Sequence, residues 1–66
     1  KGTVTVVYKL NIRESMPSTK APAIQTVMPG TKLDFVGWTG NGEPVNNNPK
    51  WYKNAQGNFF WSGGVV

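Results

Sequence analysis

Apolar and polar residues alternate over the first part of the chain, from Thr3 to Arg13. Alternation with a period of two predicts a β-strand, because successive side chains of a strand point to opposite faces. The positions that share the apolar face are Val4, Val6, Tyr8, Leu10 and Ile12. We therefore expect one strand over residues 3–13, with Tyr8 in the core.

Four shorter segments are also expected to be strands. Residues 32–38 alternate again, residues 23–27 form a short apolar run, and residues 51–54 and 58–62 are two short aromatic segments. Residues 65–66 could add a closing strand. Nowhere does an apolar period of 3.6 residues persist over ten residues, so no helix is predicted. Short strands without a helix in 66 residues predict an all-β fold, a small five-stranded β-barrel.

Turn residues mark the connections between these segments. Pro29-Gly30 suits the centre of a type II turn, since the second central position needs a positive φ. Gly57 is expected to take a positive φ in a hairpin between the last two aromatic segments. Two long polar stretches, residues 14–22 and 39–50, are expected to be loops because Pro, Ser, Thr, Gly and Asn dominate them.

The aromatic residues divide between core and surface. Phe35 shares a face with Leu33, so we assign it to the core together with Tyr8. Strand parity places Phe59 with Trp61 and opposite Phe60, which means that one member of this run faces outward.

Four motifs, taken in order, resemble bacterial SH3-like (SH3b) domains. The opening "LNIR" followed by a Pro/Ser/Thr loop is similar to the first signature of the family. The later matching segments are "AIQTVMPGTKLDFVG", "KWYKN" and "GNFFWSGGVV". Asn54 and Phe60 depart from the family pattern, and the loop over residues 39–49 is longer than is typical. The aromatic ending suggests a Bacteroidetes-type branch.

The resemblance implies a five-stranded SH3-like barrel and a function. We expect residues 1–66 to be a single domain cut from a longer protein. Relatives are appended to peptidoglycan hydrolases and peptidases, so the resemblance implies an extracytoplasmic targeting module that recognises a peptidoglycan stem or cross-bridge peptide. The alternative is an accessory domain that packs against a neighbouring catalytic domain and has no ligand of its own.

Composition argues against catalysis by this chain. It has no His and no Cys, which excludes Ser-His-Asp, Cys-His and His-metal arrangements. Its three carboxylates, those of Glu14, Asp34 and Glu43, are far apart in the sequence. We therefore expect no enzyme activity, no cofactor and no metal site.

Charge leaves the partner open. The net charge is +4, yet the lysines are scattered and form no basic run. Nucleic acid is an unlikely partner, because no motif interleaves basic and aromatic residues along one strand. Capture of proline-rich peptides is a further possibility for an SH3 shape, although the acidic loop that such binding uses is missing. No apolar run is long enough for a membrane span.

A ligand groove is expected between the two long loops, on the basis of the resemblance. Asn11 is expected to satisfy backbone groups of the first loop. Arg13 could form a surface ion pair with Glu14 or Asp34, or could bind a ligand carboxylate. Trp51 could face the ligand or the core. The full set of candidate ligand-binding residues is Arg13, Glu14, Trp38, Trp51, Tyr52 and Phe60.

Overall fold

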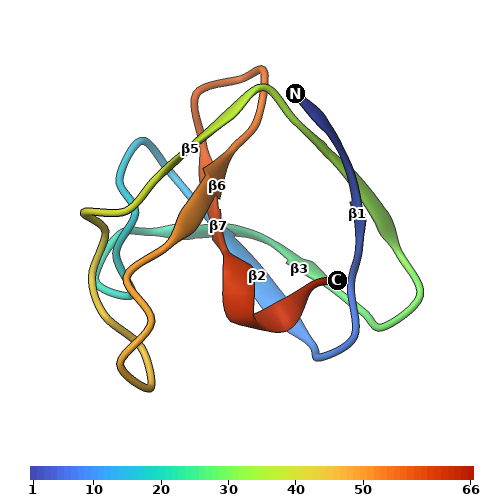
Figure 1. Cartoon of the computed structure of the whole chain (residues 1–66), viewed down its shortest axis with the longest axis horizontal. Coiled ribbons are helices and arrows are strands. Elements are labelled where there is room, and N and C mark those ends of the chain that lie inside the picture. Colours follow the sequence, from blue (N-terminus) through green and yellow to red (C-terminus); the bar gives the residue numbers. More distant parts are fainter.

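A computed structural model describes all 66 residues, with seven β-strands, one short 3-10 helix and no α-helix (Figure 1). The strands form two antiparallel sheets, which confirms the predicted all-β class. In the smaller sheet, β1 (Gly2–Thr5) pairs with β4 (Lys32–Phe35). The order in the larger sheet is β3 (Ala23–Val27), β2 (Leu10–Arg13), β7 (Phe59–Trp61), β6 (Trp51–Lys53), β5 (Gly37–Thr39). No helix here has the length and apolarity that a bilayer crossing requires.

The first predicted strand is divided into β1 and β2 by a bend. The backbone N–H groups of Val7 and Tyr8 both donate to the carbonyl of Gly64, at 2.8 and 3.3 Å. Gly64 ends the 3-10 helix (Ser62–Gly64), so a contact far away in the sequence turns the chain at this point. Tyr8 is 69% exposed as a result, and its predicted place in the core is wrong.

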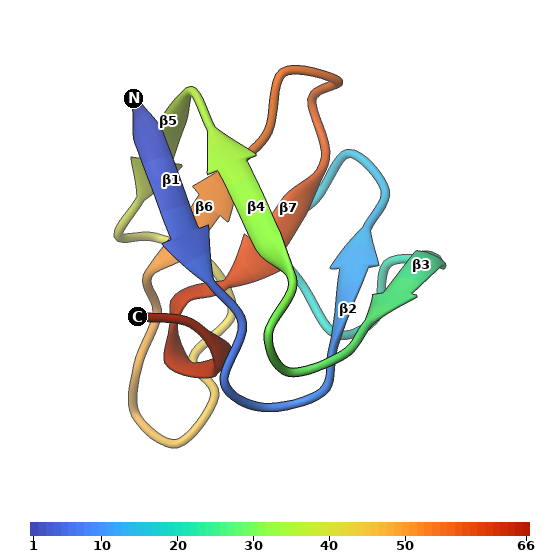
Figure 2. The ribbon, with the colours of Figure 1, turned by 90° about the vertical axis from the view of Figure 1, so that its right-hand side faces the viewer.

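The predicted strand over residues 32–38 is also divided, between β4 and β5. β4 pairs with β1 and β5 pairs with β6, so this one segment contributes to both sheets (Figure 2). Its alternation is confirmed: Leu33 and Phe35 are partly buried against the core, while Val36 and Trp38 are exposed.

The core lies between the two sheets. Its six buried members are Val4, Val6, Ile12, Val27, Phe60 and Val65. Val65 is brought there by the end of the chain, because Val66 and Thr5 exchange two backbone hydrogen bonds of 2.9 Å. Full burial of each such side chain is worth about 1.5–3 kcal/mol. The closing segment predicted at residues 65–66 forms one isolated bridge, between Val6 and Val65.

Both predicted turns have the expected backbone. Gly30 has φ 96°, and the Thr31 N–H donates to the Met28 carbonyl at 3.2 Å, as in a type II turn. Gly57 has φ 82° in the hairpin between β6 and β7. The side-chain oxygen of Asn54 accepts from the backbone N–H groups of Gln56 and Asn58 at 3.1 and 2.9 Å. A polar residue at position 54 therefore stabilises this turn.

Polar side chains pair across neighbouring strands. The Thr26 hydroxyl donates to Oδ1 of Asn11 at 2.7 Å, and the two residues are direct partners in the β2–β3 ladder. Asn11 thus bonds a strand side chain rather than the backbone of the first loop, where we had expected it. The Thr3 hydroxyl donates in the same way to Asp34, at 2.7 Å across β1 and β4.

Candidate functional site

The two long loops, residues 14–22 and 39–50, are joined by Glu43. Its carboxylate accepts from the Ser18 hydroxyl at 2.8 Å, and from the backbone N–H and hydroxyl of Thr19 at 3.0 and 2.5 Å. Its own N–H donates to the Pro17 carbonyl at 2.8 Å. Hydrogen bonds from the hydroxyls of Thr19 and then Ser18 favour the charged form and lower the pKa of Glu43. The sequence analysis did not predict this bridge. Its signal in the sequence is the single Glu in the second loop and the adjacent Ser18 and Thr19 in the first loop.

The bridge closes the second loop over Trp51. The indole N–H of Trp51 donates to the Glu43 carbonyl at 2.8 Å, and Gly42 lies against the ring. A Cβ atom at position 42 would come within 2.2 Å of Trp51 Cδ1, so only glycine fits there. Trp51 is 2% exposed. Trp51 was a candidate for contact with a ligand, but the second loop packs onto its ring and buries the side chain.

Trp61 fixes the tip of the same loop. Its indole N–H donates to the Asn48 carbonyl at 2.9 Å. The tip itself turns through Asn46 and Asn47, whose φ angles of 50° and 64° lie in the left-handed region that Asn tolerates. Gly63 lies against the far side of the Trp61 ring, where a Cβ would clash. Trp61, which was not among the predicted site residues, stays half-buried.

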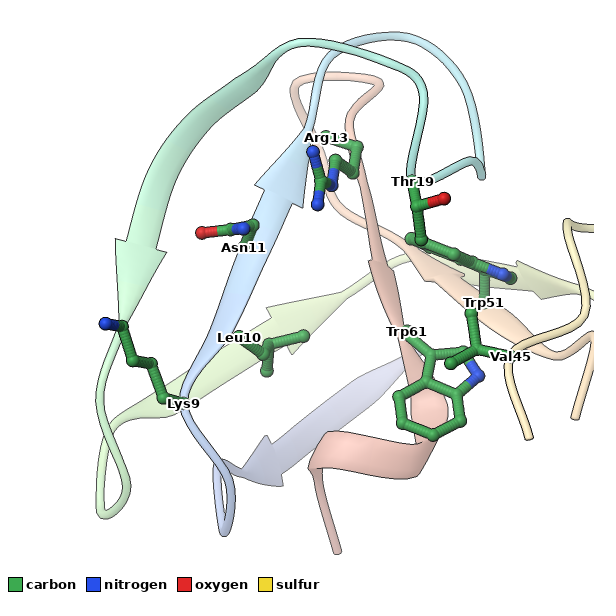
Figure 3. Close-up of a pocket in the computed structure, with 8 residues that line it drawn as sticks. All are labelled: Lys9, Leu10, Asn11, Arg13, Thr19, Val45, Trp51 and Trp61. Carbon is green, nitrogen blue, oxygen red and sulfur yellow. The ribbon is translucent and has the colours of Figure 1, made fainter.

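A groove opens between Trp61 and β2, and we call it the Arg13–Trp61 groove. Its volume is about 200 Å³. In Figure 3 the two indoles and Val45 lie on one side and β2 lies on the other, with the Asn11 amide turned away from the indoles. The lining residues are Lys9, Leu10, Asn11, Arg13, Thr19, Val45, Trp51 and Trp61.

The groove is cationic and aromatic. Arg13 supplies its cationic side chain, whereas the Lys9 ammonium points away from the indoles in Figure 3, and no carboxylate lines the groove. The Arg13 guanidinium donates to the Ala21 carbonyl at 3.1 Å, which orients it and leaves most of its five N–H donors free. Neither expected ion pair of Arg13 forms: Asp34 accepts from Thr3, and Glu14 is exposed outside the groove. These groups suit a small ligand that is anionic and partly apolar.

Two other predicted site residues belong to the core. Phe60 is completely buried, so its predicted contact with a ligand is wrong. It is the direct ladder partner of Tyr52, and both side chains point to the core face. Tyr52 is half-buried between Phe35 and Phe60, with ring centroids 4.5 and 5.5 Å away. Core packing therefore accounts for most of the Tyr52 ring.

Trp38 lies outside the groove and is 61% exposed. The Lys50 ammonium sits over its ring, 4.8 Å from the centroid. Of the six predicted site residues, the structure thus brings only Arg13 and Trp51 to one groove, and it leaves Trp38 on a separate surface.

Comparisons with protein-family models, with curated proteins and with solved structures gave no match. The SH3b resemblance therefore rests on the motifs of this chain alone and stays a prediction.

Proposed function

We propose that this chain is a non-catalytic, SH3-like module of a bacterial cell-envelope protein. It works outside the cytoplasm, appended to a cell-wall hydrolase or peptidase, and binds a peptidoglycan stem or cross-bridge peptide in the Arg13–Trp61 groove. The observation that carries the proposal is a groove that brings the Arg13 side chain and the half-buried indole of Trp61 together, with no carboxylate among its lining residues.

The chemistry of the groove matches that of such a peptide. Stem peptides consist of small residues and carry free carboxylates. The guanidinium of Arg13 provides a fork of N–H donors for a carboxylate. The rings of Trp61 and the side chains of Leu10 and Val45 provide apolar surface for short aliphatic side chains.

The barrel form is part of the proposal, and two features support it. The β4–β5 segment contributes to both sheets, as a strand shared by the two halves of an SH3-like barrel would. The bridge between Val6 and Val65 ties the end of the chain to the first strand segment. The number of strands also agrees with a five-stranded barrel, because two of the five predicted strands are each divided in two, which gives the seven observed.

The positions of the carboxylates favour binding over catalysis. Asp34 is engaged by Thr3, Glu43 joins the two loops, and Glu14 is exposed on the first loop. None of the three lines the groove. General acid–base or nucleophilic chemistry on a bound peptide would need such a group within hydrogen-bond reach.

Affinity from this groove alone should be low. Its volume of about 200 Å³ is below the roughly 300–1,000 Å³ of typical small-molecule pockets, so it holds only a short segment of ligand. Attachment to a second wall-binding or catalytic domain would raise the effective concentration and give useful avidity.

Co-sedimentation with purified sacculi tests the proposal. The unmodified chain should pellet with sacculi, and Arg13→Gln should lose most of this pelleting because its carboxylate fork is gone. Lys32→Gln is the matched control, since it also removes one positive charge but lies on β4, outside the groove. If both variants lose pelleting equally, binding depends on net charge alone, and if both pellet like the unmodified chain, Arg13 takes no part. Either result means that the groove is not the site.

An accessory role is the second candidate, and one surface favours it. Val7, Tyr8 and Met28 are all exposed, and they lie on adjoining turns because Gly30 N–H donates to the Val6 carbonyl at 2.8 Å. A neighbouring domain packed on this end would cover them. An unmodified chain that never pellets with sacculi, together with protection of Tyr8 in the longer protein, would favour this role over the module.

A further inference from the structure

Trp38 differs from the other two tryptophans in what its indole does. The indole N–H groups of Trp51 and Trp61 donate to loop carbonyls, whereas that of Trp38 has no acceptor in the protein. Trp38 lies on β5, at the edge of the five-stranded sheet, and is 61% exposed. A large aromatic ring and its N–H donor are thus both presented to solvent.

Lys50 gives this surface a charge. Its ammonium lies 4.8 Å from the ring centroid of Trp38 and 5.1 Å from that of Tyr52. Cation–π attraction restrains both the lysine and the indole, which lowers the entropy lost when a ligand orders them. No side-chain carboxylate neutralises this cation, because Asp34 and Glu43 bond to hydroxyl groups elsewhere and Glu14 is exposed on the first loop.

We propose that Trp38 and Lys50 form a second binding site, for a polysaccharide whose pyranose rings carry carboxylates. The apolar C–H face of one sugar ring stacks on the open part of the Trp38 indole. The ring carboxylate pairs with the Lys50 ammonium, and the free indole N–H donates to a sugar hydroxyl. This site shares no residue with the Arg13–Trp61 groove and does not depend on its function.

The size and surroundings of the surface favour a sugar over a protein. A specific protein interface buries roughly 800 Å² on each partner, about a fifth of the 4052 Å² surface of this chain. Trp38 is followed by Thr39, Gly40 and Asn41, which are polar or lack a side chain. A single ring with a polar surround matches one sugar unit better than the apolar centre of an interface.

The surface fits single-stranded nucleic acid less well. Binding of that kind uses successive aromatic platforms along a basic track. Here only one ring is open, and its two aromatic neighbours across the sheet, Tyr52 and Phe60, are half-buried and buried.

Nuclear magnetic resonance can test the site directly, because the chain has three tryptophans and hence three indole N–H signals. The ¹⁵N-labelled chain is titrated with an oligogalacturonate, whose every ring carries a carboxylate, and with a maltooligosaccharide of equal length as the neutral control. Trp38→Phe assigns the Trp38 signal. The signals of Trp51 and Trp61 report that the fold is intact throughout.

We expect oligogalacturonate to shift the Trp38 signal and leave that of Trp61 in place. Lys50→Gln should weaken this binding roughly two- to fivefold, the range of an exposed ion pair. Lys53→Gln is the matched control, because it removes the same charge at the end of β6, three residues after Lys50 and outside the cation–π contact, and it should bind like the unmodified chain.

Three results would overturn the proposal. The first is a Trp38 signal that does not move with the acidic sugar, and the second is an equal shift with the neutral sugar. The third is a larger shift with an oligothymidylate, which would assign the surface to nucleic acid. All three leave pelleting with sacculi unaffected, so failure here is distinguishable from failure of the groove.

Discussion

Trp51 and Trp38 occupy neighbouring rungs of one hairpin but have opposite environments. In the β5–β6 ladder Trp38 faces Tyr52, and Thr39 faces Trp51. Successive rungs point to opposite faces of the sheet, so the two indoles lie on different sides. Trp51 is 2% exposed and Trp38 is 61% exposed. Trp38 shares the core face with Tyr52 and Phe60 but lies on the edge strand β5, where the core does not cover it, whereas a loop covers Trp51 on the opposite face.

Only one of the two faces is covered by loops. Gly42 and Glu43 pack onto Trp51, and the Glu43 carboxylate anchors them to the first loop. Trp38 has only the Lys50 side chain over its ring. The same residue type is therefore a structural anchor on one face and a solvent-exposed platform on the other.

The largest expected effect comes from truncating each indole in turn. Trp51→Ala should lower the free energy of unfolding by about 3–5 kcal/mol, the usual cost of removing a buried tryptophan. Trp38→Ala should lower it by no more than about 1 kcal/mol, the upper range for loss of an exposed cation–π contact. Urea denaturation of both variants measures the contrast. Equal losses would mean that the loop does not seal Trp51.

Gly42 and Gly40 provide a second, smaller contrast. Gly42→Ala places a methyl group 2.2 Å from Trp51 Cδ1, and such overpacking should cost about 1–3 kcal/mol. At Gly40 the added carbon would be 3.7 Å from Trp38, an ordinary contact. Gly40→Ala should therefore leave stability nearly unchanged. Thermal melts of the two variants compare them, and a neutral Gly42→Ala would contradict the packing described for Trp51.

The Glu43 bridge predicts a loss of stability in acid. Because the folded chain lowers the pKa of Glu43, its contribution to stability is fully present above the unfolded pKa. It is lost as the pH falls from that ordinary value through the lowered one. Glu43→Gln should remove this part of the pH dependence and destabilise the chain less than Gly42→Ala does. Urea midpoints measured across the acid range, for both proteins, test this; parallel curves would exclude the bridge.

The smallest effect is expected for the contact between Lys50 and Trp38. A cation–π pair at an exposed site is worth about 0.5–1 kcal/mol. The coupling energy from a double-mutant cycle of Lys50→Gln and Trp38→Ala should lie in that range. A coupling of zero would mean that the lysine does not rest on the ring in solution.

Local patterns in the sequence predicted the strands well. These patterns located the outer ends of each predicted strand within one or two residues, because they reflect the geometry of the backbone at each position, but they did not show that two of the strands are divided. Gly30 and Gly57 were predicted for the same reason, since a positive φ is a local requirement. Parity correctly placed Phe59 with Trp61 and opposite Phe60.

Burial was predicted less well, because it depends on contacts distant in the sequence. Tyr8 leaves the core because the Gly64 carbonyl bends the chain. Trp51 is buried outside the core because Gly42 and Glu43 fold over its ring. For Phe60, parity separated the two faces but could not say which of them the core would cover. Arg13 was predicted as a ligand-binding residue and lines the groove, whereas Trp61 was missed because nothing local distinguished it from a core aromatic.

The most direct test of the proposed function is a titration with a soluble stem peptide that retains its free carboxylates. We predict that the indole signal of Trp61 and the guanidinium Nε–H signal of Arg13 shift together, while the Trp38 signal stays in place. The same titration of Arg13→Gln should leave the Trp61 signal unmoved. Peptide-induced shifts that spare Arg13 and Trp61, or no shifts at all, would contradict binding in the Arg13–Trp61 groove.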